Sequence, residues 1–282
     1  MSREHPVVYR CDGETVVGIV HEAVGTVGVL MIVGGPQVRA GSHRLYVQQA
    51  RRMASLGMPV FRFDARGMGD SSGPSPGFER MDADIASAIA TFRASCPQLT
   101  KVVLWGLCDG ASAALLSLPQ LTAHPVCGLC LVNPWVRTPE TEARTQVRHY
   151  YLDRLRQRAF WQRLLSGQVA MGAVSQAWQA LRKARQVPAE PAVAQAYPAR
   201  MASAWRRFDG AILLVLSEND YTAREFADVV RTDAAWRGAT DGPRVTRLDI
   251  GGADHTFSSS DAGRALVDGF SAWSRQALHE HA

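Results

Sequence analysis

The stretch that decides the fold is Leu104-Trp105-Gly106-Leu107-Cys108-Asp109-Gly110-Ala111-Ser112. Its apolar first half predicts a buried strand, and its small-residue second half predicts the start of a helix. Gly106 and Gly110, two residues on either side of Cys108, suit a strained strand-to-helix turn because glycine relieves the clashes of such a turn. The dipole of the following helix would stabilise a thiolate at the turn. We therefore predict that Cys108 is a nucleophile, the alternative being a buried cysteine in an ordinary turn.

A nucleophile needs a base, and the base needs an orienting group. Asp220 and His255 each follow a predicted strand, in the chain order nucleophile, acid, histidine. His255 would take the proton from Cys108, and Asp220 would hold the imidazole tautomer. Glu218 and Asp254 are alternative acids. Taken singly, the histidine and the aspartate could also be ordinary loop and turn residues.

A negative charge that develops on a reacting carbonyl oxygen needs backbone N–H donors. The residue after the nucleophile, Asp109, is predicted to supply one donor. The loop Gly34-Gly35-Pro36-Gln37 follows another predicted strand and is expected to supply the second. Pro36 has no N–H, which leaves Gln37, our preferred donor, or Gly35. The alternative is that the glycines simply form a turn.

Short β-branched runs alternate with helical patterns along most of the chain. Strands at 7–11 and 15–21 are predicted to form a hairpin around Asp12-Gly13. Further buried strands are predicted at 27–33, 58–63, 102–105, 126–132, 211–217 and 245–250. Helices are predicted near 43–56, 79–94, 109–118, 222–236 and 261–278. The alternation indicates an α/β fold with an eight-stranded, mostly parallel sheet and helices on both faces.

Residues 136–208 break this alternation after the sixth strand. We predict that they form a helical cap or lid inserted into a core of residues 1–135 and 209–282. From Arg137 to Arg207 the chain carries 13 Lys and Arg residues against four acidic residues. This charge is compatible with attraction of an anionic partner, and equally with a solvated helical surface.

Other residues are expected to line the pocket. His43 and Arg44 follow the oxyanion loop, and the guanidinium of Arg44 suits a carboxylate or phosphate, although both residues also fit the first turn of a helix. Trp135 and Arg137 follow the sixth strand and are expected to line the pocket from the cap side. The motif Asp64-Ala65-Arg66-Gly67-Met68-Gly69-Asp70-Ser71 is predicted to be structural, with Asp64 and Arg66 holding a glycine-rich turn.

Composition excludes several classes of protein. With 46% hydrophobic and 20% charged residues in 282 residues, the chain is predicted to be globular rather than disordered. It has no apolar run of the ~18 residues that a membrane-spanning helix needs. Residues 1–6 lack the apolar centre of a signal peptide, so we predict a cytoplasmic location.

Five cysteines, an odd number, argue against a disulfide framework. Cys127 and Cys130 lie in an apolar run and are predicted to be buried strand residues. A zinc site would need a second pair of ligands, and none is nearby. We therefore predict neither a metal nor an organic cofactor.

The chain as a whole resembles the α/β-hydrolases associated with exosortase A systems, of the hydrolase 1 type. The shared motifs are Gly34-Gly35-Pro36-Gln37, Gly41-Ser42-His43-Arg44, Phe63-Asp64 with Arg66-Gly67-Met68-Gly69-Asp70-Ser71, Trp105-Gly106-Leu107-Cys108-Asp109, Asn133-Pro134-Trp135-Val136-Arg137, His149-Tyr150-Tyr151-Leu152 and Ala253-Asp254-His255-Thr256-Phe257-Ser258. The resemblance implies the α/β-hydrolase fold and a bacterial protein encoded beside exopolysaccharide and protein-sorting genes, but no substrate. The elbow also resembles that of dienelactone hydrolases, which use a Cys-His-Asp triad.

We expect Cys108 to cleave a small-molecule or acyl-carrier ester or thioester through an acyl-cysteine intermediate, without nucleic acid as a partner. An acyltransferase that uses the same site is one alternative. A non-catalytic binding or scaffold protein at the membrane surface is another, because residues 149–161 mix basic and aromatic side chains at helical spacing. The sequence therefore also allows peripheral contact of the protein with an anionic inner membrane.

Overall fold

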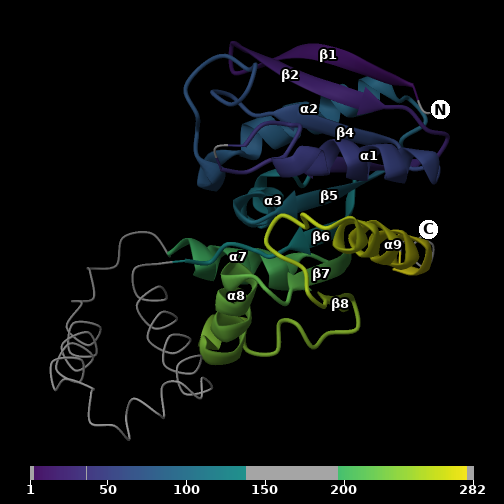
Figure 1. The fold of residues 1–282 in the computed structure, drawn as a ribbon. Coiled ribbons are helices and arrows are strands. Elements are labelled where there is room, and N and C mark those ends of the chain that lie inside the picture. Colours follow the sequence, from purple (N-terminus) through teal and green to yellow (C-terminus); the bar gives the residue numbers. More distant parts are fainter. Residues whose placement is uncertain (1–2, 36, 138–195, 278–282) are drawn as a thin grey trace, which may run out of the picture. The chain divides into compact units, whose positions relative to one another are not determined.

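The structure, a computed structural model, describes residues 3–35, 37–137 and 196–277. Its centre is an eight-stranded sheet in the order β1-β2-β4-β3-β5-β6-β7-β8 (Figure 1). The strands are β1 (Glu4–Cys11), β2 (Glu14–His21), β3 (Val27–Ile32), β4 (Val60–Asp64), β5 (Lys101–Leu107), β6 (Val126–Val132), β7 (Ala211–Ser217) and β8 (Val245–Ile250). Neighbouring strands from β4 to β8 pair in parallel, whereas β2 pairs antiparallel with both β1 and β4. The predicted eight-stranded, mostly parallel sheet is confirmed.

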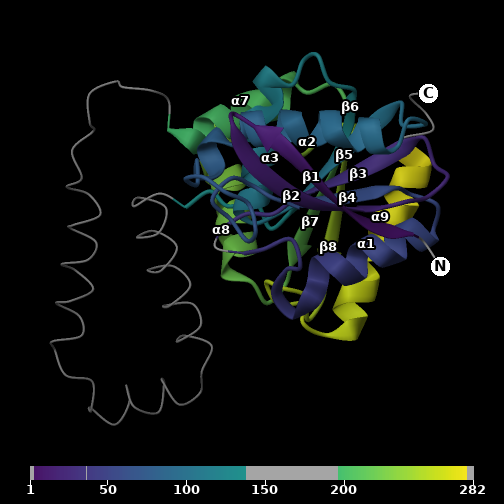
Figure 2. The ribbon, with the colours of Figure 1, turned by 90° about the horizontal axis from the view of Figure 1, so that it is seen from above.

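Helices cover both faces of this sheet, as predicted. Figure 2 shows α1 and α9 on one face and α2 and α3 on the other. The helices are α1 (Leu45–Ser55), α2 (Asp82–Ser95), α3 (Asp109–Ser117), α7 (Tyr197–Arg207), α8 (Tyr221–Thr232) and α9 (Ser260–Ala277). Short 3-10 helices span Ser42–Arg44, Phe78–Arg80, Leu118–Gln120 and Ala234–Trp236.

The predicted hairpin forms the antiparallel edge. Its turn residues Asp12 and Gly13 both have positive φ, 47° and 84°. Two such residues in a two-residue loop are typical of a type I′ turn, whose twist matches that of the strands. The first strand begins at Glu4, three residues before its predicted start at Val7, because Glu4 pairs with His21 in the ladder.

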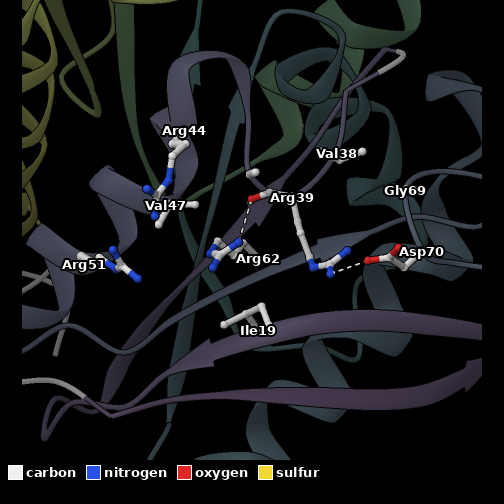
Figure 3. A pocket seen from close by; sticks show the side chains of 10 residues that line it. Ile19, Val38, Arg39, Arg44, Val47, Arg51, Arg62, Gly69 and Asp70 are labelled. Carbon is white, nitrogen blue, oxygen red and sulfur yellow. Dashed lines mark hydrogen bonds and ion pairs between the residues drawn. The ribbon is translucent and has the colours of Figure 1, made fainter.

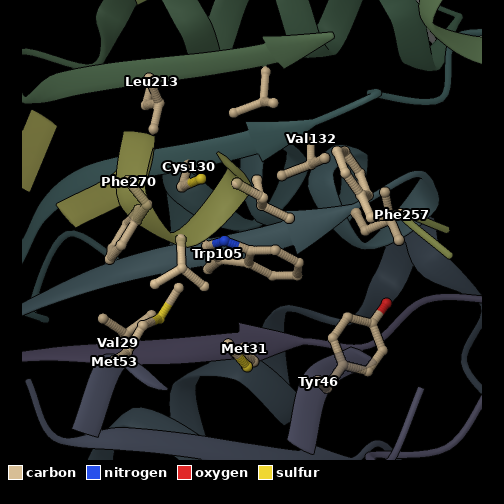
Figure 4. Close-up of a cluster of buried hydrophobic side chains, with 14 of the residues drawn as sticks. Val29, Met31, Tyr46, Met53, Trp105, Cys130, Val132, Leu213, Phe257 and Phe270 are labelled. Carbon is tan, nitrogen blue, oxygen red and sulfur yellow. The ribbon is translucent and has the colours of Figure 1, made fainter. Parts of the chain in front are cut away.

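The main core lies between the sheet and helices α1 and α9. Trp105 on β5 is completely buried and meets Tyr46 of α1 edge-on, with ring centroids 5.7 Å apart. Figure 4 shows Met31, Phe257 and Phe270 around it. Central strands are covered on both faces, so they read as continuous apolar runs rather than as alternating patterns.

The chain divides into two compact units, one of Met1–Trp135 with Ala196–Ala282 and the other of Val136–Gln195. The sequence placed residues 136–208 in the insertion, whereas this division gives α7 to the first unit. Trp205 of α7 is completely buried, meets Trp236 edge-on at 5.6 Å and donates its indole N–H to Ala239 O at 2.7 Å. Residues 138–195 of the predicted lid lie outside the described residues.

The two cysteines of the C-x-x-C pair both lie in β6, as predicted. Cys130 is buried, Cys127 is half-buried, and neither forms a disulfide. None of the helices in the described ranges is long and apolar enough to cross a membrane.

The Asp64–Ser71 motif holds its turn, but Asp64 and Arg66 have separate partners. The buried carboxylate of Asp64 accepts the Asp70 N–H at 3.2 Å and the Arg39 N–H at 2.5 Å. Arg66 instead pairs with the buried Asp84 of α2, with Nη2 2.8 Å from Oδ2. The structural role predicted for the motif is therefore correct, although Arg66 anchors the turn to α2.

Candidate active site

Cys108 occupies the sharp turn between β5 and α3, with φ 59° and ψ −125°. A non-glycine residue at positive φ is strained and must be held by its surroundings. The Cys108 N–H donates to Val132 O at 2.9 Å, and the Cys108 carbonyl accepts the N–H groups of Ala111, Ser112 and Trp135 at 3.1, 3.2 and 3.2 Å. The thiol residue itself stays half-buried. The turn thus presents the sulfur at the carboxyl end of the sheet.

The flanking glycines are required by close packing. A Cβ at Gly106 would overlap the backbone of Gly110 and Ala111. A Cβ at Gly110 would overlap Ile32 O at the end of β3. The spacing of these glycines therefore lets β5, α3 and β3 approach one another closely at Cys108.

The sheet changes direction at this point. From β3, the chain adds β4 on one side and then β5 on the other. Open α/β sheets place their binding sites outside the carboxyl ends of the strands at such a switch point. The Gly34–Gln37 loop follows β3 and Cys108 follows β5, so both border this crevice.

His255 joins the two other predicted members of the triad. Its Nδ1 lies 2.8 Å from Asp220 Oδ2. The hydrogen bond to Asp220, followed by a hydrogen bond to Cys108, raises the pKa of His255 to about 10 from 6.5. The structure therefore brings Cys108, His255 and Asp220 together in the order that the sequence predicted.

The Asp220 carboxylate is itself fixed by backbone hydrogen bonds. It caps α8 by accepting the N–H groups of Thr222 at 3.0 Å and Ala223 at 3.3 Å, and its side chain is only 6% exposed. A carboxylate with these partners has a fixed orientation toward His255. Among the three possible acids, it is the one in contact with the imidazole.

The two alternative acids have other partners. Glu218 accepts the Gly252 N–H at 2.7 Å. Asp254 accepts the N–H groups of Thr256 at 3.1 Å and Ser258 at 3.0 Å. A hydrogen bond from the Ser258 side chain, followed by that from its N–H, lowers the pKa of Asp254. Both carboxylates thus shape the loops around His255 without orienting its ring.

Asp109 has an arrangement that the sequence did not predict, because its carboxylate turns back onto the loop after β3. Burial raises the pKa of Asp109, although the N–H groups of Gly35, Asp109 and Gly110 donate to the carboxylate and oppose the shift. A Cβ at Gly34 would overlap this carboxylate. Gly35 therefore faces the Asp109 side chain, and Gln37 is half-buried two residues further on.

The predicted pocket residues differ in their burial and contacts. Trp135 is half-buried and donates its N–H to Cys108 O. Arg137 belongs to the other compact unit, so its role stays a prediction. His43 and Arg44 are exposed and have positive φ of 52° and 60°. Arg44 lines a cleft whose lining includes none of the triad residues.

A buried amide next to the site was missed as a functional residue. Asn133 follows β6 with a φ of 45° and is fully buried. Its Nδ2 donates to Ser217 Oγ and its Oδ1 accepts the Ser217 N–H, both at 2.9 Å. The pair ties the carboxyl ends of β6 and β7, between Cys108 and Asp220. The only sequence signal is a polar residue directly after an apolar strand.

Within residues 3–35, 37–137 and 196–277, no group of three or more His, Cys, Asp or Glu side chains is arranged to hold a metal ion. The site that these residues do form is a thiol, an imidazole and a carboxylate at the switch point of a parallel sheet. It defines an α/β protein with a sharp strand-to-helix turn at the carboxyl edge of its sheet.

Residues 29–268 match the alpha/beta hydrolase family, and the chain belongs to it. Solved structures agree on the fold. The esterase Pf2001 from Pyrococcus furiosus is 12% identical with a TM-score of 0.64, and the alignment covers 98% of this chain and 92% of that one. DcsB, solved in complex with its substrate analogue, is 19% identical with a TM-score of 0.62, over 98% and 99% of the two chains.

Est1E from Butyrivibrio proteoclasticus, solved with bound ferulic acid, is 12% identical with a TM-score of 0.61, over 97% of this chain and 99% of that one. No curated protein matches this chain.

Proposed function

We propose that the chain cleaves an ester or thioester through an acyl intermediate on Cys108. The observation that carries this proposal is His255, which contacts both the Asp220 carboxylate and Cys108. Nucleophile, base and orienting group in hydrogen-bond contact are the arrangement that acyl transfer requires. The esterase and the substrate-analogue and ferulic acid complexes among the similar structures support this class of chemistry.

The raised pKa of His255 decides how the first step begins. The hydrogen bonds to Asp220 and Cys108 raise the pKa of His255 to about 10, which makes its ring a base strong enough to take the proton of the Cys108 thiol. The nucleophile is then a thiolate paired with an imidazolium. His255 thus acts first as a general base toward Cys108 and then as a general acid toward the leaving group.

In the first half-reaction, the Cys108 thiolate attacks the acyl carbon and the carbonyl oxygen becomes an oxyanion. The Asp109 N–H and a second donor from the loop after β3 stabilise this charge. The N–H groups of Gly35 and Asp109 both also donate to the Asp109 carboxylate, so that bond does not select between the donors, and we keep Gln37 as the second donor. The bond to the leaving group breaks, and the departing alkoxide or thiolate takes the proton of His255.

In the second half-reaction, neutral His255 takes a proton from water, and the hydroxide attacks the acyl-cysteine. Collapse of this intermediate releases the carboxylic acid and restores the thiolate and the imidazolium. Asp220 keeps Nδ1 protonated throughout, which leaves Nε2 for both proton transfers. Water and the acyl compound balance the reaction without an oxidant, a reductant or another co-reactant.

The test is acylation of the protein by p-nitrophenyl acetate, followed by release of p-nitrophenol and mass spectrometry of the intact chain. We expect one acetyl group on Cys108 and its loss in Cys108→Ala. The matched control is Cys127→Ala, which removes another half-buried thiol and should leave the burst unchanged. Full esterase activity in Cys108→Ala would refute the assignment, and a chain that no activated ester acylates would favour a scaffold role.

The narrower assignments rest on the sequence. Association with a bacterial exosortase system, a thioester as the preferred substrate and a cytoplasmic location stay predictions. Activity against acyl esters and acyl thioesters of graded chain length, compared between wild type and Cys108→Ser, tests the substrate class.

A further inference from the structure

A cleft of about 580 Å³ lies beside α1, where four arginine side chains meet. Arg62 comes from β4, Arg39 from the loop after β3, Arg44 from the 3-10 helix just before α1, and Arg51 from the middle of α1. In Figure 3 the side chains of Arg44 and Arg51 extend toward that of Arg62. Apolar side chains such as those of Ile19, Val38 and Val47 complete the walls.

Two of these arginines are neutralised by carboxylates. Arg51 Nε lies 2.5 Å from Glu4 Oε1. Arg39 pairs with the buried Asp64 and, through Nη2 at 2.6 Å, with Asp70 at the edge of the cleft. All three carboxylates next to the cleft are therefore already paired.

The other two arginines have no carboxylate partner among the described residues. Arg62 is only 7% exposed and donates to His21 Nε2 at 2.9 Å and to Arg39 O at 3.0 Å, which are both uncharged acceptors. Burial, followed by the charge of Arg62, lowers the pKa of His21 to about 4. Arg44 is exposed, and within the described ranges no hydrogen bond or ion pair engages its guanidinium.

A buried cation without an ion-pair partner in contact is costly, and although the charges of Glu4 and Asp64 act on Arg62 from further away, an anion in direct contact with it would offset more of this cost. Burial lowers the pKa of Arg62 to about 10, so it stays charged at neutral pH. Four guanidinium groups stand against three carboxylates here, so the cleft keeps a net positive charge, which the charge of a phosphate monoester, about −1.5 to −2 at pH 7, would offset. The planar donors of arginine also suit the bidentate recognition of phosphate oxygens.

We propose that this cleft binds the phosphate group of a phosphorylated ligand between Arg44 and Arg62. Its volume falls within the range of roughly 300–1,000 Å³ found for small-molecule sites, and the apolar wall would receive the organic part of the ligand. Val38 and Arg39 directly follow Gln37, so the bound phosphate would contact the same loop that borders Cys108. The proposal does not depend on acyl chemistry at Cys108.

Calorimetric titration of the full chain at pH 8 with inorganic phosphate, sulfate and acetate tests the charge argument. Both dianions should bind at least about tenfold more tightly than acetate. Arg44→Gln should weaken phosphate binding by about tenfold, because a charge-assisted bidentate contact is lost. Arg93→Gln is the matched control, since Arg93 is an exposed helical arginine on α2 without a partner in the described ranges, and it should leave binding unchanged.

A second variant gives a gain that unfolding cannot mimic. Asp70→Asn removes the exposed acid that pairs with Arg39 and should strengthen phosphate binding by about threefold. Equal affinities for phosphate and acetate, no binding of either dianion, or equal losses in Arg44→Gln and Arg93→Gln would overturn the proposal. Sedimentation with phosphatidic acid vesicles, compared with phosphatidylcholine vesicles, identifies the molecule that carries the bound phosphate. Pelleting with phosphatidic acid that depends on Arg44 supports a lipid phosphate. Arg44-dependent binding of free phosphate without such pelleting supports a soluble ligand.

Discussion

Replacing Asp220 with Asn removes the negative charge behind His255 and keeps almost the same side-chain shape. The Asn oxygen can still accept the Thr222 N–H, which lies 3.0 Å from Oδ1, whereas the amide group replaces Oδ2, which accepts the Ala223 N–H at 3.3 Å. Asn and Asp are comparable helix N-caps, so the free energy of unfolding should change by less than about 1 kcal/mol. The contact that changes character is the one at 2.8 Å to His255 Nδ1.

An Asn amide that faces Nδ1 donates a hydrogen, which favours the tautomer that carries its proton on Nε2. That tautomer cannot take the proton of Cys108. The equivalent change in a serine protease lowers kcat by about 10⁴-fold, and a thiol needs less help from the base because it is the more acidic nucleophile. We therefore expect acylation to slow by about 100- to 1,000-fold, which is roughly 2.7–4.1 kcal/mol of transition-state stabilisation.

The assay is stopped-flow acylation by p-nitrophenyl acetate, with urea denaturation of the same samples. Glu218→Gln is the matched control, because Glu218 is an acid near His255 that bonds the Gly252 N–H instead; its acylation rate should equal that of the wild type. An Asp220→Asn variant with an intact fold and a rate within threefold of the wild type would show that this carboxylate does not orient the base. A large loss in Glu218→Gln alone would move the role to that residue.

Gly34→Ala should lower the free energy of unfolding in urea by about 1–3 kcal/mol, because its Cβ would overlap the Asp109 carboxylate. The control Gly242→Ala, whose Cβ meets nothing within 4 Å, should lower it hardly at all. Equal losses in the two variants would contradict the packing argument. Asn133→Ala should destabilise the fold by roughly 2–3 kcal/mol, because it leaves the buried Ser217 N–H and hydroxyl without their partner. A loss of stability below about 0.5 kcal/mol, the lower end of the net contribution of a single hydrogen bond, would argue against this role of Asn133. His255 has a pKa raised from 6.5 to about 10, so its contribution to stability should be complete below pH 6.5 and be lost as the pH rises toward 10. The difference in unfolding free energy between the wild type and His255→Gln across this range measures that loss, and a difference that grew with pH would reverse the assigned sign.

Strands and helices with strong apolar patterns were predictable almost to the residue. β6 and β7 begin and end where the sequence predicts, at Val126–Val132 and Ala211–Ser217. Both are buried on two faces, so their apolar runs have the length of the strand itself. The assignment of α7 depended instead on tertiary packing, because only the burial of Trp205 against Trp236 shows which unit the helix joins.

The candidate site was predictable in its residue types and chain order but not in its finer contacts. The sequence offers three candidate carboxylates for His255, and only the loop geometry selects Asp220 among them. The backward turn of the Asp109 side chain depends on the adjacency of β3 and β5, which are not consecutive strands. The local sequence pattern contains no information about a contact between segments that follow non-consecutive strands. The Arg44–Arg62 cleft likewise arises from segments that only the folded sheet brings together.

Since the residues around Cys108 come from β3, β5, β7 and β8, they meet only when both halves of the sheet have closed on the central strands. Contacts of such sequence separation form late and set the pace of folding. The rate at which Cys108 is alkylated in a refolding chain would therefore follow the most non-local step. Cys11 ends β1 in the local β1–β2 hairpin, but its thiol also bonds Ser87 of α2, so it would become protected when α2 packs against the hairpin. The alkylation rates of the two thiols thus report different stages of folding: that of Cys11 reports the packing around the first hairpin, and that of Cys108 reports completion of the sheet.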